Sequence, residues 1–331
     1  MKTSIKTLLS ITFVAMVMSA SAQSSEPTTL IRLYEDNDFF NLSGHGTDFS
    51  YSAGTRLDIF YKREGRPRGL NRLMPRLKNS NTVYGWSLMQ MIYTPINLSK
   101  SELQSQDYMY SGALFVNHSL YSYNAEKRQG LQTEFIAGVR GPRSFAQQTQ
   151  SAVHKVIHDV IPQGWNDQLD DQVLLNVNVT YERQLWALSN FLEVNAGTQV
   201  KAGSMMDAVS VYPMVRLGKM SPYFDSYLNQ FTSFQKGKKR VKTQYYLVFR
   251  PTASVVMYNA MVEGHTIPVN AQNPASRFHP NNMEHHVLDF QFGAVVVLNK
   301  FGISYMQTTS ATYIEGSVTH VVGNLSLYYS W

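Results

Sequence analysis

Polar and apolar residues alternate along most of this chain with the period of two that β-strands require. In the segment 173–180, one face carries Val173, Leu175, Val177 and Val179, and the other carries Asn176, Asn178 and Thr180. Similar segments recur up to the last residue, and each is about long enough to cross a lipid bilayer as a tilted strand. The alternation therefore predicts an all-β protein whose strands have membrane-crossing length.

The chain contains twelve such segments. We expect strands at 29–38, 48–62, 82–93, 107–120, 130–141, 173–184, 190–203, 207–217, 242–258, 284–297, 301–314 and 318–331. An even number of antiparallel strands can close into a barrel, which leaves no strand edge exposed to lipid. The expected fold is thus a twelve-stranded antiparallel transmembrane β-barrel. A soluble β-sandwich would show the same alternation and is the alternative at this point.

The segment 146–161 departs from the period of two. Its apolar residues recur at helical spacing, and Pro162 follows it. They are Val153, Val156, Ile157, Val160 and Ile161. A second face carries the polar side chains Gln147, Gln150, His154 and His158. We expect a short helix in the connection after the fifth strand.

The two ends of the chain favour a membrane barrel over a sandwich. Residues 1–22 combine Lys2 and Lys6, an apolar run and a small-residue site at 20–22, which is typical of a secretory signal peptide. Removing these 22 of the 331 residues leaves 309, which we expect to form one domain, 23–331. The last strand ends on Trp331, which resembles the aromatic ending, most often phenylalanine, that the barrel assembly machinery recognises. These features predict localisation in the bacterial outer membrane.

Composition supports the same class. The mean hydropathy is −0.24, yet the chain holds 20 Tyr, 17 Phe and 4 Trp. A barrel with a polar lumen and aromatic girdles combines these properties. The absence of cysteine excludes disulfides and thiolate chemistry. No later run of 18 apolar residues predicts a spanning helix, and loss of Lys2 and Lys6 lowers the net charge from +6 to +4.

Strand parity assigns each connection to one side of the membrane. If both termini are periplasmic, the extracellular connections are 39–47, 94–106, 142–172, 204–206, 259–283 and 315–317. The long connection 218–241 is then periplasmic. Its basic run (Lys236, Lys238, Lys239 and Arg240) is interpreted as a solvated loop. His265, His285 and His286 are interpreted as surface histidines, although a metal role remains open.

Parity also brings reactive side chains to the extracellular rim. Asn37 and Asp38 close the first strand, Ser52 opens the second with the parity of a lumen-facing residue, and His154 lies after the fifth. Carboxylate and amide oxygens suit a hard cation such as calcium, and histidine can act as a general base. Each residue alone also has an ordinary structural explanation in turn or helix formation.

Several motifs, taken in order, resemble the outer-membrane lipid A 3'-O-deacylases, the LpxR family. They are Asn37-Asp38, Tyr51-Ser52-Ala53-Gly54, Ile92-Tyr93-Thr94-Pro95, Asp107 with Tyr110-Ser111-Gly112, Gly141-Pro142, His154 and Gly164-Trp165-Asn166-Asp167-Gln168. The similarity runs from the first strand to about residue 168. It implies a twelve-stranded barrel that acts on lipid A, the anchor of lipopolysaccharide, among the lipids of the outer membrane.

The resemblance also implies a calcium-dependent hydrolysis of an acyl ester. His154 would deprotonate water, Asn37 and Asp38 would hold the cation or orient its ligands, and Ser52 would replace a family threonine. Lys100 and Gln150 would bind or orient the substrate. In this reading the cation stabilises the oxyanion.

The chain departs from the family where substrate would be held. Lys100, followed by Ser101, is the one plausible match to the basic residues of the connection between the third and fourth strands. The family acid six residues after the histidine falls on Val160, beside Asp159, and the family's Asp-Arg-Pro-Tyr reads Asp107-Tyr108-Met109-Tyr110. These changes affect the expected contacts with phosphate and the choice of acyl chain.

Two other functions remain open on the sequence alone. Ser52 and His154 could serve as nucleophile and base of an outer-membrane phospholipase, although no Gly-x-Ser-x-Gly motif is present. A non-enzymatic barrel, either a pore or a structural protein, is the other alternative. Nucleic acid is not expected as a partner, because neither a phosphate-binding glycine loop nor a nucleic-acid motif occurs.

Overall fold

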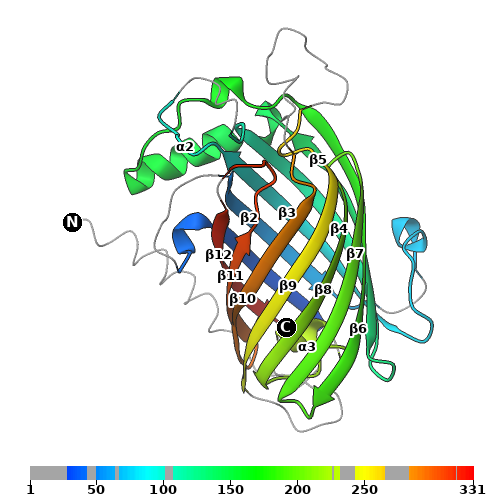
Figure 1. The fold of residues 1–331 in the computed structure, drawn as a ribbon. Coiled ribbons are helices and arrows are strands. Elements are labelled where there is room, and N and C mark those ends of the chain that lie inside the picture. Colours follow the sequence, from blue (N-terminus) through cyan, green and yellow to red (C-terminus); the bar gives the residue numbers. More distant parts are fainter. Residues whose placement is uncertain are drawn as a thin grey trace.

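The computed structural model describes residues 28–42, 50–63, 67–100, 107–225, 227–231, 243–264, 283–317 and 319–331. Twelve antiparallel strands close into a barrel, in which β1 pairs with both β2 and β12 (Figure 1). The predicted fold class is confirmed. The strands are β1 (Thr29–Asn37), β2 (Ser50–Tyr61), β3 (Asn81–Thr94), β4 (Ser111–Asn124), β5 (Gln129–Arg140), β6 (Gln172–Leu188), β7 (Leu192–Gly203), β8 (Met206–Lys219), β9 (Thr243–Asn259), β10 (His286–Leu298), β11 (Phe301–Ser310) and β12 (His320–Ser330).

All twelve predicted strands are present, and three of them, β4, β6 and β11, differ by four residues at one or both ends. The strand predicted at 107–120 is β4, Ser111–Asn124. Its start is delayed because the Asp107 carboxylate accepts hydrogen bonds from the backbone N–H groups of Ile96 and Tyr108, both at 2.7 Å. β11 ends at Ser310 rather than at residue 314, and Ile314 instead forms an isolated bridge with Met283.

The predicted helix is α2 (Ala146–Ile157), which is shorter than the expected 146–161. His158 ends the helix in the left-handed conformation, with φ 62°, four residues before Pro162. Val160 and Ile161 therefore lie beyond the helix. The shorter helices are η1 (Asp38–Phe40), η2 (Gly69–Arg72), η3 (Pro142–Ser144), η4 (Trp165–Asp167) and α3 (Tyr227–Gln230). In the described ranges, no helix is both long and apolar enough to cross a membrane.

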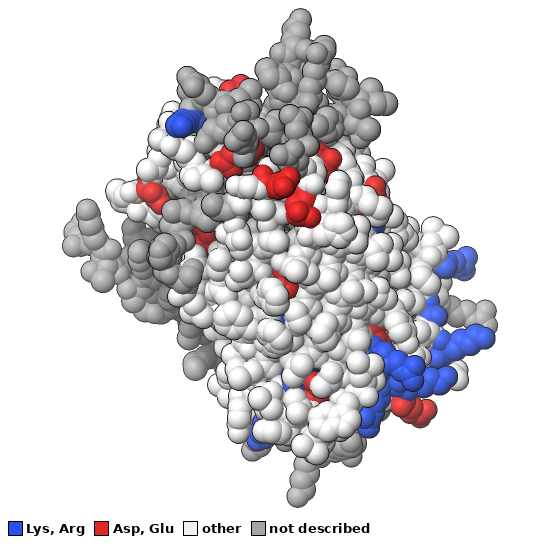
Figure 2. Space-filling view, viewed as in Figure 1, with Lys and Arg blue, Asp and Glu red and all other residues white. Residues whose placement is uncertain are grey.

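The barrel has two different rims. The α2 rim, defined by the ends of β1, β3 and β5 and the starts of β2, β4 and β6, carries η1, α2 and η4 (Figure 1). The opposite rim carries both ends of the described chain. Figure 2 shows few charged side chains on the wall between the rims, whereas acidic side chains gather near the α2 rim and basic ones at the lower right. The uncharged wall is what a membrane-embedded barrel presents to lipid.

Polar networks fill much of the lumen. Asp58 accepts hydrogen bonds from Arg32 Nε at 2.7 Å and from Arg56 Nε at 2.6 Å. Near the opposite rim, Arg216 Nη1 donates to Glu193 Oε2 at 2.7 Å, and both side chains are 2% exposed. Because each of these charged groups is hydrogen-bonded to a group of opposite charge, the cost of burying them in the lumen is offset.

The connection after β8 folds into the barrel at the opposite rim. Leu228 of α3 is fully buried in a cluster of inward-facing side chains. The ring of Phe231 stacks on Tyr328 of β12, with centroids 4.1 Å apart. The described part of this connection, 220–225 and 227–231, therefore packs across the lumen. Only part of the predicted periplasmic loop 218–241 is described, and its basic run lies outside the described residues.

Some predictions cannot be compared with this structure. The signal peptide 1–22, Ser101 and His265 lie outside the described residues. His285 and His286 are described: His285 Nδ1 lies 2.6 Å from the backbone oxygen of Val256, and the His286 side chain is 83% exposed. Neither belongs to a group of metal-ligating side chains in the described ranges.

Candidate active site

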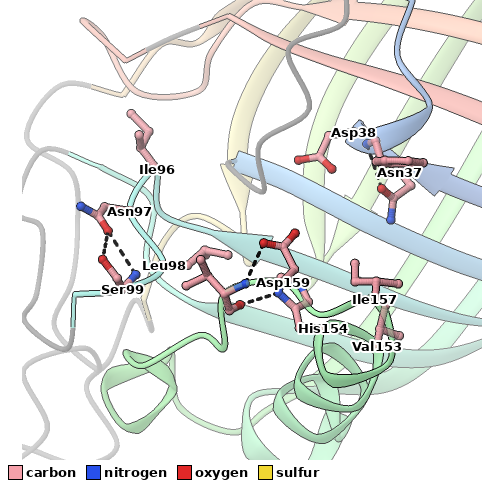
Figure 3. Close-up of a pocket in the computed structure, with 12 residues that line it drawn as sticks. Asn37, Asp38, Ile96, Asn97, Leu98, Ser99, Val153, His154, Ile157 and Asp159 are labelled. Atoms are coloured by element: carbon pink, nitrogen blue, oxygen red, sulfur yellow. Dashed lines mark hydrogen bonds between the residues drawn. The ribbon is translucent and has the colours of Figure 1, made fainter.

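A pocket of about 320 Å³ opens at the α2 rim between three parts of the chain: η1, the connection after β3, and the end of α2. Asn37 and Asp38 lie across it from His154 and Asp159 (Figure 3). Polar and apolar residues line it in equal number. They are Asn37, Asp38, Asn97, Ser99, His154 and Asp159, with Phe39, Ile96, Leu98, Val153, Ile157 and Val160.

The end of β1 supplies Asn37 and Asp38. The Asn37 side chain caps η1, because its Oδ1 accepts the backbone N–H of Phe39 at 2.9 Å. This cap turns the chain, so Asp38 leaves the strand and lines the pocket, where it is 6% exposed. Asp36, one residue inside the strand, instead bonds Tyr34, Tyr51 and Asn324. The two aspartates at the end of β1 therefore have different surroundings: Asp36 bonds other side chains in the lumen, and Asp38 lines the pocket.

His154 lies on the buried face of α2 and is 3% exposed. Its Nδ1 lies 2.6 Å from the backbone oxygen of Val160. A carbonyl oxygen only accepts, so Nδ1 carries the proton, and in the neutral ring Nε2 is then the basic nitrogen. The left-handed His158 makes this contact possible because it turns the chain back along the helix. Val160, where the family has an acid, orients the imidazole through its backbone.

Gln150 lies one turn before His154 and is 5% exposed. Its Oε1 accepts the indole N–H of Trp165 at 2.9 Å. Trp165 is 1% exposed and packs against Tyr110, with ring centroids 4.9 Å apart. The Nε2 of Gln150 is buried and makes no hydrogen bond within the described part of the chain. Gln150 is therefore fixed by its oxygen, and it does not line the pocket.

Two glycines let α2 approach the barrel wall. A Cβ on Gly112 of β4 would lie 2.1 Å from the Cβ of Ala146, the first residue of α2. Gly141 has φ +101°, and a Cβ there would lie 2.6 Å from the backbone nitrogen of Asp171. Only glycine permits both the close approach and the positive φ. The glycines of the sequence motifs thus determine where the helix, and with it His154, is held.

Ser52 does not line the pocket. It lies at a β-bulge, where the register between β2 and β3 shifts between Tyr51 and Ala53. The bulge interrupts the alternation, so the lumen parity predicted for Ser52 from Arg56 and Asp58 does not extend to it. Ser52 is fully buried and shares a short hydrogen bond with Thr94 at the end of β3.

The connection between β3 and β4 presents little positive charge to the pocket. Lys100 is exposed and follows the pocket residue Ser99 without lining the pocket itself. Tyr108 and Met109, which replace the family's Arg-Pro, are 1% and 4% exposed and pack in the interior. Burial raises the pKa of the Asp107 carboxyl, and this carboxyl holds the backbone of Ile96 in the pocket wall. No Lys or Arg is among the described residues that line the pocket.

The donor set of the pocket fits a hard cation. Asn37, Asp38 and Asp159 offer amide and carboxylate oxygens, which suit calcium, and the chain has no thiolate. Among the described residues no three His, Asp or Glu side chains form a metal cluster. Calcium would therefore rely on the carboxylates of Asp38 and Asp159 and on neutral oxygens, as its ligand preferences allow.

Comparison with known proteins identifies the family. The family described as "Outer membrane protein LpxR" matches residues 8–331. The chain belongs to the LpxR family. Among solved structures, LpxR from Salmonella typhimurium has a TM-score of 0.70 and 16% identity, with 91% of this chain and 100% of that chain covered. At this identity the match shows a shared barrel fold, and family membership makes the chain an outer-membrane β-barrel protein.

A second solved structure is less similar. The β domain of the Bordetella autotransporter BrkA has a TM-score of 0.44 and 9% identity, with 93% of this chain and 99% of that chain covered. No curated protein matches the chain.

Proposed function

We propose that this LpxR-family protein hydrolyses an ester-linked acyl chain of lipid A in a calcium-dependent reaction. The observation that carries the proposal is the pairing, in one pocket, of His154 with its Nδ1 proton held by the Val160 carbonyl and of the buried carboxylate of Asp38. The first is a general base, and the second is a ligand for a hard cation.

His154 would act through Nε2. Water placed between this nitrogen and the ester carbonyl carbon loses a proton to Nε2 as its oxygen bonds to the carbon. The proton then passes to the departing alkoxide oxygen as the acyl C–O bond breaks, so the products are a fatty acid and a lipid A hydroxyl. The bond from Nδ1 to the Val160 oxygen stabilises the imidazolium that forms between these steps.

Asn37 and Asp38 would hold the cation, and Gln150 would assist. Calcium, when bound, supplies positive charge for the developing oxyanion. Asn37 is preorganised by its bond to Phe39, and Asp38 is withdrawn from solvent, which strengthens its interaction with a cation. Gln150 does not line the pocket, and it would assist by holding α2 in place through its bond to Trp165.

We further propose that the α2 rim faces the extracellular side, where lipid A lies. The two longest connections, those after β5 and β9, lie at this rim, as long connections do on the outside of outer-membrane barrels. Val153, Val156 and Ile157 of α2 are 48%, 77% and 56% exposed. An exposed apolar helix face beside a pocket suits a substrate whose acyl chains stay in the membrane.

The two alternative functions have less support. A Ser52 nucleophile would need His154 within reach, but Ser52 bonds Thr94 and is not part of the wall that holds His154. An open pore would need a clear lumen, but Leu228 and Phe231 pack inside the barrel.

Mass spectrometry of lipid A tests the proposal. The protein, expressed in an outer-membrane host, should remove one acyl chain from lipid A in isolated membranes when calcium is present and not in EGTA. His154→Ala should reduce the rate about 10²- to 10⁴-fold, the usual contribution of a general base. His158→Asn is the matched control, because it changes a neighbouring histidine and asparagine tolerates the left-handed conformation. It should retain the wild-type rate.

Unmodified lipid A from a folded wild-type barrel would refute the deacylase function. Release of fatty acid from phospholipid instead of lipid A would favour the phospholipase alternative. Equal rates in His154→Ala and wild-type protein would exclude His154 as the base.

A further inference from the structure

The connection between β2 and β3 folds back onto the outer wall of the barrel. It lies at the opposite rim and is drawn in light blue at the right of Figure 1. Its described parts, 62–63 and 67–80, include the short helix η2. Leu77 N donates to Ser122 Oγ at 3.0 Å, and the Asn124 amide donates to the Asn79 oxygen at 2.8 Å. These bonds fix the connection to β4.

Met74 anchors this connection on the lipid-facing side of the wall. Tyr84 of β3 and Leu120 of β4 share strand parity with the exposed Trp86 and Val116, so they point outward. Yet Tyr84 and Leu120 are 3% and 0% exposed, because Met74 packs over them. The connection thus occupies space that lipid would otherwise fill.

A polar contact holds the upper part of the connection. His118, also at an outward-facing position of β4, is 4% exposed and stacks on Trp86, with ring centroids 4.2 Å apart. Its Nε2 lies 2.6 Å from Asn71 Oδ1 of η2. Outward-facing tyrosine and tryptophan rings mark the interfacial girdle of a membrane barrel. The contact therefore places η2 at the depth of lipid headgroups.

The connection is strongly basic. Its described residues include Lys62, Arg63, Arg68, Arg72, Arg76 and Lys78 and no acidic residue. Arg68 and Arg72, at the two ends of η2, are exposed, and neither forms an ion pair with a carboxylate among the described residues. Figure 2 shows basic side chains gathered on this side of the molecule.

An apolar groove of about 540 Å³ begins at η2 and continues along the wall. Leu70 of η2 lines the start of the groove. The residues that line the rest include Trp86, Val116, Phe135, Ala137 and Leu175. This volume falls in the range of roughly 300–1,000 Å³ that is common for small-ligand sites. Arg68 and Arg72 each lie two residues from Leu70 in the sequence, so both cationic side chains belong to the short helix at which the groove starts.

The groove follows a hydrogen-bonded row across five strands. Trp86 pairs with His118, His118 with Phe135, Phe135 with Val177, and Val177 with Ala202. Four steps of about 4.8 Å give a length of roughly 19 Å. Trp86 lies eight residues from the α2-rim end of β3, whereas Ala202 is next to the α2-rim end of β7. The row therefore rises along the wall from the η2 side toward the α2 rim.

We propose that this surface is a binding site for an anionic phospholipid. The phosphate would lie between Arg68 and Arg72, and one acyl chain would follow the groove past Val116 and Ala137. Given the orientation proposed above, the lipid belongs to the periplasmic leaflet. The net positive charge of the connection selects an anionic headgroup over a zwitterionic one, because clustered arginines near a membrane surface attract net negative charge.

Native mass spectrometry of the full-length mature barrel in mild detergent tests the site. The probes are phosphatidylglycerol and phosphatidylcholine with identical acyl chains. The wild-type protein should retain one phosphatidylglycerol in preference to phosphatidylcholine, and added NaCl should weaken this preference. Arg68→Gln/Arg72→Gln should bind phosphatidylglycerol roughly 30-fold more weakly, which corresponds to about 1 kcal/mol for each cationic side chain.

A matched control removes the same charge elsewhere. Lys219→Gln/Lys300→Gln neutralises two lysines at the opposite rim, outside the connection and the groove, and should bind like wild-type protein. Ala137→Trp fills the groove from an exposed position and should weaken binding of both lipids. The faster gel migration of the unheated barrel would report folding of each variant.

Three outcomes would overturn the proposal. They are no preference for phosphatidylglycerol in the wild-type protein, unchanged binding in Arg68→Gln/Arg72→Gln, and an equal loss in the lysine control. The measurement does not involve lipid A hydrolysis, so its result is independent of the proposed activity.

Discussion

At the α2 rim, a backbone carbonyl determines the orientation of the His154 ring. The oxygen of Val160 fixes the Nδ1 proton and thereby the basic nitrogen. Any residue with a backbone oxygen could make this contact, so the chain can place valine where the family has an acid.

In the proposed reaction, Asp38 is the buried carboxylate that would hold the cation. Asp38→Asn keeps the size of the side chain and removes its charge. Since carboxylate count tunes calcium affinity, the calcium concentration that gives half-maximal lipid A hydrolysis should rise about tenfold or more. Titration of deacylation against buffered free calcium would measure it.

Glu35→Gln is the control for this titration. Glu35 lies on the same strand, bonds Thr55 and does not line the pocket. The calcium dependence of lipid A hydrolysis by the Glu35→Gln protein should match that of the wild-type protein. If Asp38→Asn gave the same midpoint as wild-type protein, Asp38 would not be a ligand.

At the scale of elements, the amphipathic helix α2 is oriented the opposite way from a helix of a water-soluble protein. Its polar face, with Gln150 and His154, is buried against the barrel, and its apolar face is exposed. In a water-soluble protein this arrangement would be unfavourable. Beside a membrane the exposed valines and isoleucine can contact acyl chains, so the same helix presents the proposed general base inward and a lipid-compatible surface outward.

Val156→Glu tests that interpretation. Val156 is 77% exposed and does not line the pocket. A charge there should lower deacylation of membrane-embedded lipid A about fivefold or more, because about 1 kcal/mol of apolar contact is lost. Rates in outer-membrane vesicles and in detergent would be compared, and the loss should be larger in vesicles.

Lys155→Glu is the matched control, since it adds more negative charge at the neighbouring exposed position without removing apolar surface. A loss as large as that of Val156→Glu would attribute the effect to charge alone.

At the scale of the whole molecule, the barrel separates two tasks between its rims. The candidate active site lies at the α2 rim, and the opposite rim holds the packed segment after β8 and the basic connection after β2. Side chains fill the lumen between the two rims. Hydrolysis at the α2 rim does not need an open channel through the barrel. The packing at the opposite rim should therefore serve stability.

Leu228→Ala should destabilise the barrel without changing the site. Leu228 is fully buried among inward-facing side chains, so truncation should lower the free energy of unfolding by about 2–5 kcal/mol. Urea unfolding, followed by the gel migration of unheated samples, would show a lower midpoint. The folded fraction should keep the wild-type rate of lipid A hydrolysis.

Leu42→Ala provides the comparison, because Leu42 is 69% exposed at the other rim and its truncation should change stability by less than about 0.5 kcal/mol. Equal midpoints for Leu228→Ala and Leu42→Ala would show that the packed segment contributes little to stability.

Several features could be predicted from the sequence because they depend on local pattern. The twelve strands follow from residue alternation, and the start of α2 from helical spacing. Predictions failed where a side chain or a backbone conformation changed the local pattern. Asp107 delayed β4, the left-handed His158 shortened α2, and the bulge at Ser52 broke the parity on which its direction depended.

The sequence by itself determined the closed barrel, the side of the barrel on which Asn37, Asp38 and His154 meet, and the family to which the motifs belong. Alternation and strand parity encode these because each strand repeats the same two-residue geometry. Only the tertiary structure decided which face of α2 is buried, that Val160 orients His154, and that the connection after β2 lies on the outer wall. These depend on backbone groups and on contacts between distant segments, which leave no periodic signal in the chain.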